Sequence, residues 1–215
     1  DATSLYLNQK EKNRSVSFKR GVMRAVGYVI ETSGNKVIEQ YKRSDANKLR
    51  DYLFQRGLVG SSLTRTFTTI RALLNYAYKE QGLTISNPFS GVNYDRSYGV
   101  QERKPIPQES LRAIQRRCRA MDDEPRWLIS LVSDTGMRLA EAAGLLIEDL
   151  KVNETIPHVV IKEYPWRRLK TKDSNRVIPL VGEALWGARR IVENQSSQYA
   201  FPKFNKTSTT NSNSA

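Results

Sequence analysis

Apolar residues recur every three or four positions over residues 15–89, a spacing that predicts a bundle of short helices. Three helices are expected, over residues 15–32, 45–56 and about 62–82. Ser44 suits the N-cap of the second helix, and Gly57 and Gly82 suit the ends of the second and third. The clearest apolar stripe lies on the third helix and consists of Leu63, Phe67, Ile70, Leu74 and Tyr78.

A segment of glycine, polar and basic residues, 96–104, follows this bundle and predicts a linker between two domains. The domains are therefore expected to cover residues 1–95 and 105–215. In the second domain the pattern predicts a helix from Pro107 to Met121, a buried helix before Gly136, a strand at 158–161 and a last helix over 181–194.

One stretch in the second domain combines a turn, an arginine and a glutamate. Thr135-Gly136 interrupts an apolar run, and a helix is expected to begin near Arg138 and to continue through Leu146. A guanidinium fixed at the start of a helix offers a rigid fork of donors that suits a phosphate group. Glu141 stands one helical turn further on and can brace the arginine. The alternative is an ordinary surface arginine with an i,i+3 partner, which contributes little.

A basic hairpin is predicted downstream, over residues 167–180. The pattern indicates a strand, a polar turn at 173–175 and a second strand that ends at Pro179. Between Lys162 and Arg176 there are six basic and two acidic residues, with a tyrosine and a tryptophan among them. Such a ribbon is either a solvated surface hairpin or one that enters a DNA groove.

The charge balance favours a polyanionic partner. The chain has 35 Lys and Arg against 22 Asp and Glu, a net charge of +13 and a pI of about 9.9. Residues 1–104 hold 18 basic and 9 acidic residues, whereas residues 105–215 hold 17 and 13. The net charge is therefore +9 in the first part and +4 in the second, as expected if the first part binds phosphates. The alternative is a basic protein kept soluble by its charge.

Composition also limits the possible classes of protein. The single cysteine, Cys118, occupies an apolar helical position, so we expect a core residue and a reducing cytoplasm rather than a disulfide framework. One histidine and one cysteine cannot form a usual zinc site, and no cofactor or metal is expected. No apolar run approaches membrane-spanning length, so no membrane partner is expected.

The two motifs together resemble the catalytic domain of tyrosine recombinases, the phage-integrase family. That family has Thr-Gly-x-Arg-x-x-Glu followed by Leu and Asp, and later a β-hairpin with Lys-Thr-Lys, Ser, Arg and a closing Val/Ile-Pro-Leu. Both patterns occur here in order, at 135–149 and 170–180. The helix at 62–82, followed by Asn87-Pro88-Phe89, is similar to the end of the family's core-binding domain.

The resemblance implies a mainly α fold, with a SAM-like helical core-binding domain and an α+β catalytic domain that carries a small antiparallel sheet, as in DNA breaking-rejoining enzymes. It implies site-specific DNA recombination or integration by metal-independent strand cleavage and rejoining, through a 3′-phosphotyrosyl intermediate. Arg138 then corresponds to the first catalytic arginine, with Glu141 behind it. Lys170 is expected to be the general acid for the leaving 5′ oxygen, with Lys172 as the alternate.

DNA contacts are expected from basic and polar residues that lie off the apolar stripes. They are Lys42, Arg43, Thr64, Arg65, Thr68, Arg71, Arg103, Lys104, Arg167 and Arg168. The sequence does not separate phosphate contacts from base contacts. The resemblance implies that the partner is double-stranded DNA with an attachment site, and that the full-length protein assembles as a tetramer on it.

The family completes its site with a His-x-x-Arg helix, a further His or Trp, and a C-terminal tyrosine nucleophile, none of which occurs here. The only histidine, His158, is followed by Val159-Val160-Ile161, and Tyr199 precedes the expected His-x-x-Arg position. We therefore expect a fragment of a prokaryotic or phage-encoded cytoplasmic protein that binds DNA without cleaving it. The alternative is a non-catalytic DNA-binding regulator that retains the recombinase fold.

Overall fold

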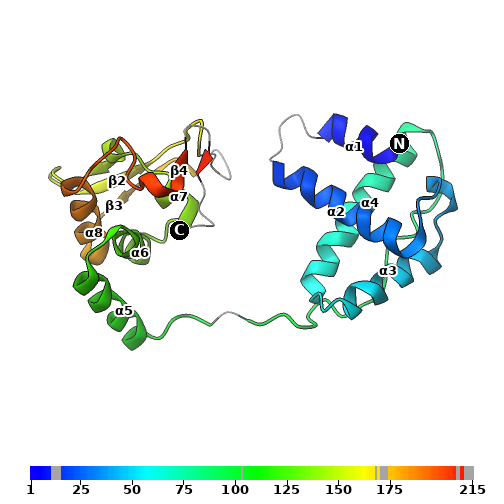
Figure 1. Ribbon diagram of the computed structural model, residues 1–215, viewed down its shortest axis with the longest axis horizontal. Helices are drawn as coiled ribbons and strands as arrows, with labels where there is room; N and C mark the ends of the chain where they lie inside the picture. The colour runs from blue at the N-terminus through cyan, green and yellow to red at the C-terminus, as the bar shows by residue number, and fades with distance from the viewer. Residues whose placement is uncertain (11–15, 103, 168, 170–173, 207–208, 211–215) are drawn as a thin grey trace. The chain divides into compact units, whose positions relative to one another are not determined.

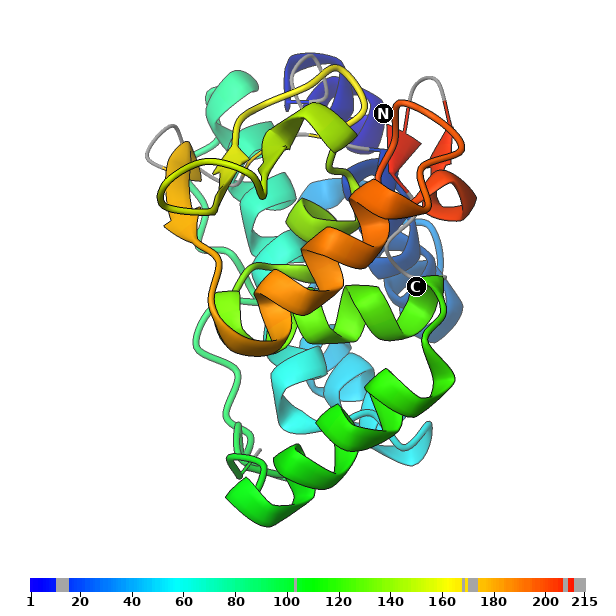
Figure 2. The same ribbon diagram turned by 90° about the vertical axis from the view of Figure 1, so that its left-hand side faces the viewer.

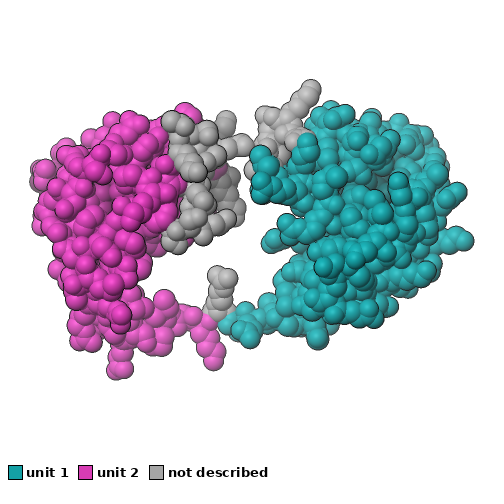
Figure 3. All heavy atoms as spheres, in the orientation of Figure 1, with its two compact units in different colours: residues 1–103 teal, residues 104–215 magenta. Residues whose placement is uncertain are grey.

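The structure, a computed structural model, describes residues 1–10, 16–102, 104–167, 169, 174–206 and 209–210. The chain forms two compact units, residues 1–103 and 104–215, which Figure 3 draws in teal and magenta. Figure 1 shows that helices make up most of both units and that the second also carries strands. The predicted fold class, mainly α with a small antiparallel sheet, is confirmed.

Unit 1 is a helical bundle. Its described helices are α1 (Ala2–Lys10), α2 (Val16–Ser33), α3 (Arg43–Gln55) and α4 (Gly60–Glu80), with a short 3-10 helix at Ile38–Gln40. The predicted apolar stripe of α4 is buried along its length, because α1 and α2 both pack against this helix. Gly57 and Gly82 follow α3 and α4 with φ of +75° and +66°, conformations that favour glycine and stop each helix.

The start of α3 differs from the prediction. The N-cap residue is Lys42, not Ser44, and the helix begins at Arg43. Asp45 lies in the first turn, where its carboxylate accepts the Lys42 main-chain N–H at 2.9 Å. This carboxylate satisfies a helix-end donor and moves the start of the helix toward the N-terminus.

Residues 87–100 pack back onto unit 1 and are called the strap below. Phe89 is buried, the Tyr94 ring stacks on Phe67 at 5.5 Å, and the Tyr98 ring meets Phe54 edge-on at 5.1 Å. The carbonyl of Tyr98 also accepts the Gly60 N–H at 2.8 Å. Tyr98 belongs to the stretch 96–104 predicted as linker, yet it is anchored on the helical unit.

Unit 2 places helices around a three-stranded sheet. Its described helices are α5 (Gln108–Met121), α6 (Glu124–Thr135), α7 (Leu139–Ala143) and α8 (Gly182–Glu193). Its described strands are β1 (Leu150–Lys151), β2 (His158–Ile161), β3 (Arg176–Pro179), β4 (Asn205–Lys206) and β5 (Thr209–Thr210). The sheet order is β1-β2-β3, all antiparallel, and β4 pairs with β5 separately.

Helices α6 and α8 pack side by side, as Figure 2 shows in green and orange, and the core of unit 2 gathers residues of both helices and of the sheet. Gly187 allows this close approach, since a Cβ there would lie 2.9 Å from the Trp127 carbonyl oxygen. Asp134, near the end of α6, accepts the Glu183 main-chain N–H at 2.7 Å and so caps the start of α8. Cys118 is buried, as predicted.

One prediction for unit 2 was wrong in extent. The helix expected to run through Leu146 ends at Ala143, because the Asp149 carboxylate accepts the Leu146 N–H at 3.1 Å and turns the chain. Strand β3 pairs with β2, in the register Val159 to Ile178. In the strand predicted to begin at residue 167, Arg167 forms a bridge with Tyr164, and residues 168 and 170–172 lie outside the described residues. The alternating burial of β2 gives this strand one buried face.

Candidate functional site

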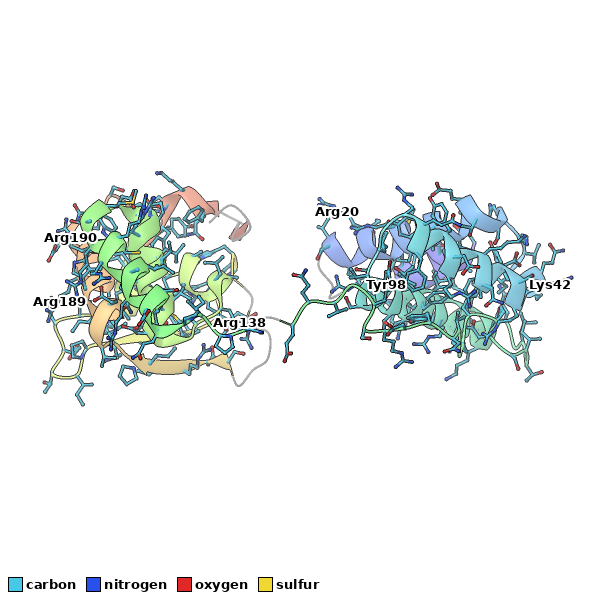
Figure 4. All side chains as sticks on the ribbon, turned by 90° about the horizontal axis from the view of Figure 1, so that it is seen from below. Arg20, Lys42, Tyr98, Arg138, Arg189 and Arg190 are labelled. Carbon is cyan, nitrogen blue, oxygen red and sulfur yellow. The ribbon has the colours of Figure 1, made fainter. Side chains whose placement is uncertain are left out.

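Arg138 lies between a glycine turn and a short helix. Gly136 ends α6 with a φ of +62°, which favours glycine, and Arg138 is the N-cap residue of α7. The Arg138 side chain is 53% exposed, and Figure 4 labels it on unit 2. The main chain on both sides therefore fixes the base of a side chain that is half exposed to solvent.

Glu141 binds this arginine twice and a second arginine once. Its Oε2 accepts the Arg138 main-chain N–H at 3.0 Å, and its Oε1 accepts Arg138 Nη1 at 2.6 Å. Arg176, from β3, donates Nη2 to Oε2 at 2.8 Å. The Glu141 side chain is only 4% exposed. A buried carboxylate thus orients two guanidinium groups, an arrangement that an isolated surface ion pair does not provide.

The pKa of Glu141 lies below its ordinary value. Burial is the largest influence and acts in the other direction, since it disfavours the charged form. The hydrogen bonds from Arg176 and Arg138 favour the carboxylate and outweigh burial. Glu141 is therefore ionised at neutral pH, and both arginines keep their partner. Such preorganised donors can stabilise negative charge on a bound phosphate without rearranging.

Arg167 is placed differently from its prediction as a DNA contact. It is 2% exposed, and it donates Nη1 to the Glu141 main-chain oxygen at 2.8 Å and Nη2 to the Lys162 oxygen at 2.5 Å. Its guanidinium therefore crosslinks two main-chain segments inside unit 2. Burial lowers the pKa of Arg167, and a buried guanidinium with these partners is structural rather than a surface phosphate ligand.

A network of polar and aromatic side chains surrounds buried Arg167. The Tyr164 hydroxyl donates to Asp149 Oδ1 at 2.7 Å, and the Tyr164 ring lies 5.0 Å from the Arg167 guanidinium carbon. The Trp166 ring stacks on Tyr164 at 4.7 Å. Burial, followed by the hydrogen bond to Asp149, raises the pKa of Tyr164 to about 12. Tyr164 and Trp166 therefore pack on each other, and Tyr164 also packs on Arg167.

Arg176 is the site residue that our sequence reasoning did not select. Its Nη1 also donates to the Ser174 oxygen at 2.9 Å, so it joins the end of the basic segment to Glu141. The signal was present, because the arginine of the Ser, Arg, Val/Ile-Pro-Leu pattern stands directly before the closing strand residues. Its partner could not be read from the motif, since Glu141 lies 35 residues earlier in the chain.

This architecture is similar to solved structures of integrases. The Tn1549 transposon integrase in complex with circular intermediate DNA matches with a TM-score of 0.75 at 16% identity, over 97% of this chain and 71% of that chain. A complex of the same integrase with transposon right end DNA gives a TM-score of 0.74 at 18% identity, over 97% and 71%. A lambda integrase dimer bound to a COC′ core site gives 0.70 at 10% identity, over 97% of this chain and 57% of that chain.

The chain has the fold of these integrases. No protein-family model matches the sequence, and no curated protein matches it. The integrase fold is therefore shared at low sequence identity. The tyrosine-recombinase fold that the two motifs predicted is confirmed.

Four of the predicted catalytic and DNA-binding residues are outside the part of the chain that the structure describes. Lys170, its alternate Lys172, Arg168 and Arg103 lie outside the described residues. Lys104 is described and exposed. The assignment of Lys170 as general acid therefore stays a prediction from the motif.

In unit 1 the predicted DNA contacts of α4 lie off its buried stripe. Arg65 and Thr68 are exposed, and Arg71 donates Nη2 to Thr68 Oγ1 at 3.1 Å. Thr64 is partly buried, because its hydroxyl donates to the Gly60 oxygen at 2.9 Å and accepts from the Tyr94 hydroxyl at 3.2 Å. Thr64 is thus bonded within unit 1, Thr68 is exposed but bonded to Arg71, and Arg65 is exposed.

The two basic residues at the start of α3, Lys42 and Arg43, differ from each other. Lys42 is exposed. Arg43 was predicted to meet phosphate, but its guanidinium donates to the main-chain oxygens of Pro88 at 2.9 Å, Gly91 at 2.6 Å and Ser90. Arg43 therefore holds the strap, and this contact uses donors that a phosphate would need.

Two further observations concern cofactors and membranes. The described residues bring no three His, Cys, Asp or Glu side chains into an arrangement that could hold a metal ion. Within the described part of the chain, every helix is too short or too polar to cross a bilayer.

Proposed function

We propose that this protein is a tyrosine recombinase that performs site-specific recombination or integration of DNA. The observation that carries the proposal is the half-exposed Arg138 guanidinium braced by buried Glu141, at the start of a helix in an integrase fold. The two motifs at 135–149 and 170–180 support it, as does the net charge of +13. The solved integrases with this fold are in complex with DNA, which supports double-stranded DNA as the partner here.

Each proposed role follows from the chemistry of cleaving a phosphodiester without a metal. Arg138 binds the non-bridging oxygens of the phosphate and stabilises the charge that develops on them. Lys170 donates a proton to the leaving 5′ oxygen. The nucleophile is a tyrosine, which forms a 3′-phosphotyrosyl link that the 5′ hydroxyl of a second strand later attacks. Protein and DNA thereby exchange one phosphodiester bond for another, and no external energy source is required.

We further propose that the 215-residue chain binds DNA but does not cleave it by itself. Its one histidine, His158, lies on β2 with Nδ1 against the Ile156 oxygen at 2.8 Å, and it forms no His-x-x-Arg motif. Exposed Arg65, Thr68, Lys42 and Lys104 are the candidates for DNA contact outside the catalytic position. Strand exchange requires two cleaved duplexes, which fits assembly as a tetramer on attachment-site DNA.

The experiment that tests the proposal is covalent trapping on a nicked suicide substrate that carries the attachment site. The protein comes from the whole reading frame that contains this sequence, and the 215-residue chain is assayed beside it. We expect a covalent protein–DNA adduct from the former only. Arg138→Ala and Lys170→Ala are each expected to slow adduct formation by about 10²–10³-fold, as expected for lost electrostatic or acid catalysis.

The matched control is Lys203→Ala, which removes one exposed charge from unit 2 and is expected to cleave normally. Normal cleavage by Lys170→Ala with loss in Lys172→Ala would reassign the general acid and keep the function. DNA binding without any adduct would instead support a non-catalytic DNA-binding regulator with this fold.

A further inference from the structure

Among the described residues, three arginines converge on Glu141, and one of these three belongs to the proposed catalytic set. Arg138 donates to Oε1, Arg176 donates to Oε2, and Arg167 donates to the main-chain oxygen of the same residue. The two additional arginines flank residues 168–175, the basic segment that contains the Lys-Thr-Lys motif. Glu141 is therefore held from both its side chain and its main chain by residues on either side of that segment.

The contact with Arg176 determines how the Glu141 carboxylate can turn. Oε2 has two donors, the Arg138 main-chain N–H at 3.0 Å and Arg176 Nη2 at 2.8 Å. Oε1 is then left for a single bond to Arg138 Nη1. Without Arg176 the carboxylate is free to take the Arg138 guanidinium in a bidentate fork, the preferred geometry of such pairs. That fork would use donors that a phosphate needs.

The contact with Arg167 fixes the helix turn itself. Arg167 is buried and binds the main chain of Glu141 at 2.8 Å, so the first turn of α7 cannot shift without breaking a charge-assisted hydrogen bond inside the unit. The other end of the same guanidinium binds the Lys162 oxygen, which belongs to the chain after β2. Arg167 thereby registers α7 against the sheet.

We propose that Arg176 and Arg167 are positioning residues, which act through the carboxylate and the main-chain oxygen of Glu141 to keep the outer donors of Arg138 open for a DNA phosphate. This inference rests on the proposed function, since it assumes that Arg138 meets phosphate. It extends that function by assigning Arg176 a role without contact to the reacting atoms.

Glu141 supplies a readout that a purely structural role would not change. The charged groups that face it are Arg138 on its own helix, Arg176 on β3, and Arg167 with Asp149 3.9 Å behind it. Its depressed pKa keeps the carboxylate ionised, and this arrangement is lost as the pH falls through that pKa. Removal of Arg176 leaves burial opposed by Arg138 alone, so the pKa of Glu141 rises and the arrangement is lost at higher pH.

The test measures the affinity of the 215-residue chain for a 30-base-pair duplex, by fluorescence anisotropy at low salt, as the pH is lowered from 7. Arg176→Gln is expected to weaken binding about tenfold at pH 7, comparable to the loss of one charge-assisted contact. Its remaining pH-dependent loss is expected to begin at higher pH than in the parent. Arg176→Lys, which keeps one donor for Oε2, is expected to recover most of the affinity.

A double-mutant cycle separates positioning from direct contact. If Arg176 acts through Glu141, the double variant Arg176→Gln/Glu141→Gln binds no more weakly than either single variant. Additive losses would mean that Arg176 touches the DNA itself and would overturn the proposal. The proposal would also be overturned if DNA affinity rose as the pH fell. That result would mean that the Glu141 carboxylate only repels the phosphate, so that its protonation favours binding.

The control is Arg189→Gln, which removes an exposed charge on α8 (Figure 4) and is expected to leave the pH dependence unchanged. Thermal unfolding confirms that each variant is folded, and Arg176→Lys serves if Arg176→Gln is not. No effect of Arg138→Ala on DNA affinity would count against the proposed function. A loss in Arg138→Ala with normal binding by Arg176→Gln would count against positioning alone.

Discussion

Arg43 in unit 1 and Arg138 in unit 2 have the same predicted ligand but different partners. Both side chains are exposed, and both stand at the first residues of a helix. Arg43 donates to main-chain oxygens of Pro88, Ser90 and Gly91, whereas Arg138 donates to the carboxylate of Glu141. The guanidinium donors of Arg43 are taken up by main-chain oxygens of the protein itself. In Arg138 the buried carboxylate binds Nη1, and the remaining guanidinium donors stay available to a ligand.

The kind of partner therefore separates an arginine that stabilises the fold from one that is prepared for a ligand. Arg167 belongs with Arg43, because its terminal nitrogens bind main-chain oxygens. Arg176 combines both kinds, with Ser174 as its main-chain partner and Glu141 as its carboxylate. Substitutions of Arg43 or Arg167 should act mainly on stability, and those of Arg138 should act mainly on the proposed affinity for DNA.

The largest effect is expected from Arg167→Ala. The change leaves the Glu141 and Lys162 main-chain oxygens unpaired inside unit 2 and removes the charge that faces Asp149. We expect a loss of about 3–5 kcal/mol in the free energy of unfolding, the usual cost of removing one partner of a buried charged group. Urea unfolding followed by tryptophan fluorescence measures it. A loss below about 1 kcal/mol would show that buried carbonyl contacts do not mark a structural arginine.

The next effect concerns the strap that Arg43 holds. In Gly60→Ala the new Cβ would lie 2.5 Å from the main-chain oxygens of Asp95 and Arg96, so the strap must move. We expect unit 1 to lose about 1–3 kcal/mol, the range for overpacking. The Gly60 N–H donates to the Tyr98 main-chain oxygen, so faster hydrogen exchange of this amide would report that the strap has detached from α4.

Its matched control is Gly27→Ala, a helical glycine with nothing within 4 Å of the new Cβ. That variant should be more stable than the parent by about 0.5–1 kcal/mol. Equal behaviour of the two alanine variants would mean that the strap does not pack on the start of α4.

Smaller effects are expected from Arg43→Ala and Arg138→Ala, and these two variants test the comparison between the two arginines directly. Arg43→Ala is expected to cost about 1 kcal/mol of stability through lost hydrogen bonds to the strap. Arg138→Ala leaves Glu141 its bonds from the Arg138 main chain and from Arg176, so it is expected to cost no more stability than Arg43→Ala. It is expected to reduce the slope of log affinity against log salt by about 0.9, the value for one phosphate contact. The comparison fails if Arg43→Ala reduces this slope as much as Arg138→Ala does. Unfolding and salt-titrated DNA binding are measured on the same preparations.

The smallest effect is a change of stability at high pH. Tyr164 has a folded-state pKa of about 12 against an ordinary value of 10.0. Its contribution is complete below pH 10 and is lost as the pH rises toward 12, because the unfolded chain ionises first. The urea midpoint should therefore fall more steeply over this window in the parent than in Tyr164→Phe. An equal fall in both would exclude Tyr164 as the cause.

Local patterns predicted the elements well where a buried stripe defines them. Helices α2, α3, α4 and α8 follow from periodicity, whereas α1 was not among the predicted helices. Arg138 and Glu141 follow from a turn and a one-turn spacing. The length of α7 does not, because it depends on pairing of residues 145–147 with residues 198–200 and on Asp149.

The sequence also could not predict which arginines stabilise the fold and which are available to a ligand. Arg43 meets the Gly91 carbonyl 48 residues away, and Arg167 meets that of Glu141 26 residues away. Every residue has a main-chain carbonyl, so composition and spacing give no sign of such partners. Basic residues that are alike in sequence therefore differ in function only after folding.

The strap also shortens the chain between the two units. Because residues 87–100 pack on the helices of unit 1, no more than seven residues, 101–107, lie between the strap and α5. Seven fully extended residues span about 25 Å at most. If both units bind one duplex, as the proposed function requires, a tether of this length gives the second unit a local concentration in the millimolar range once the first has bound. Two individually weak contacts would then act as one strong contact, and loosening the strap would lower that local concentration without altering either binding surface.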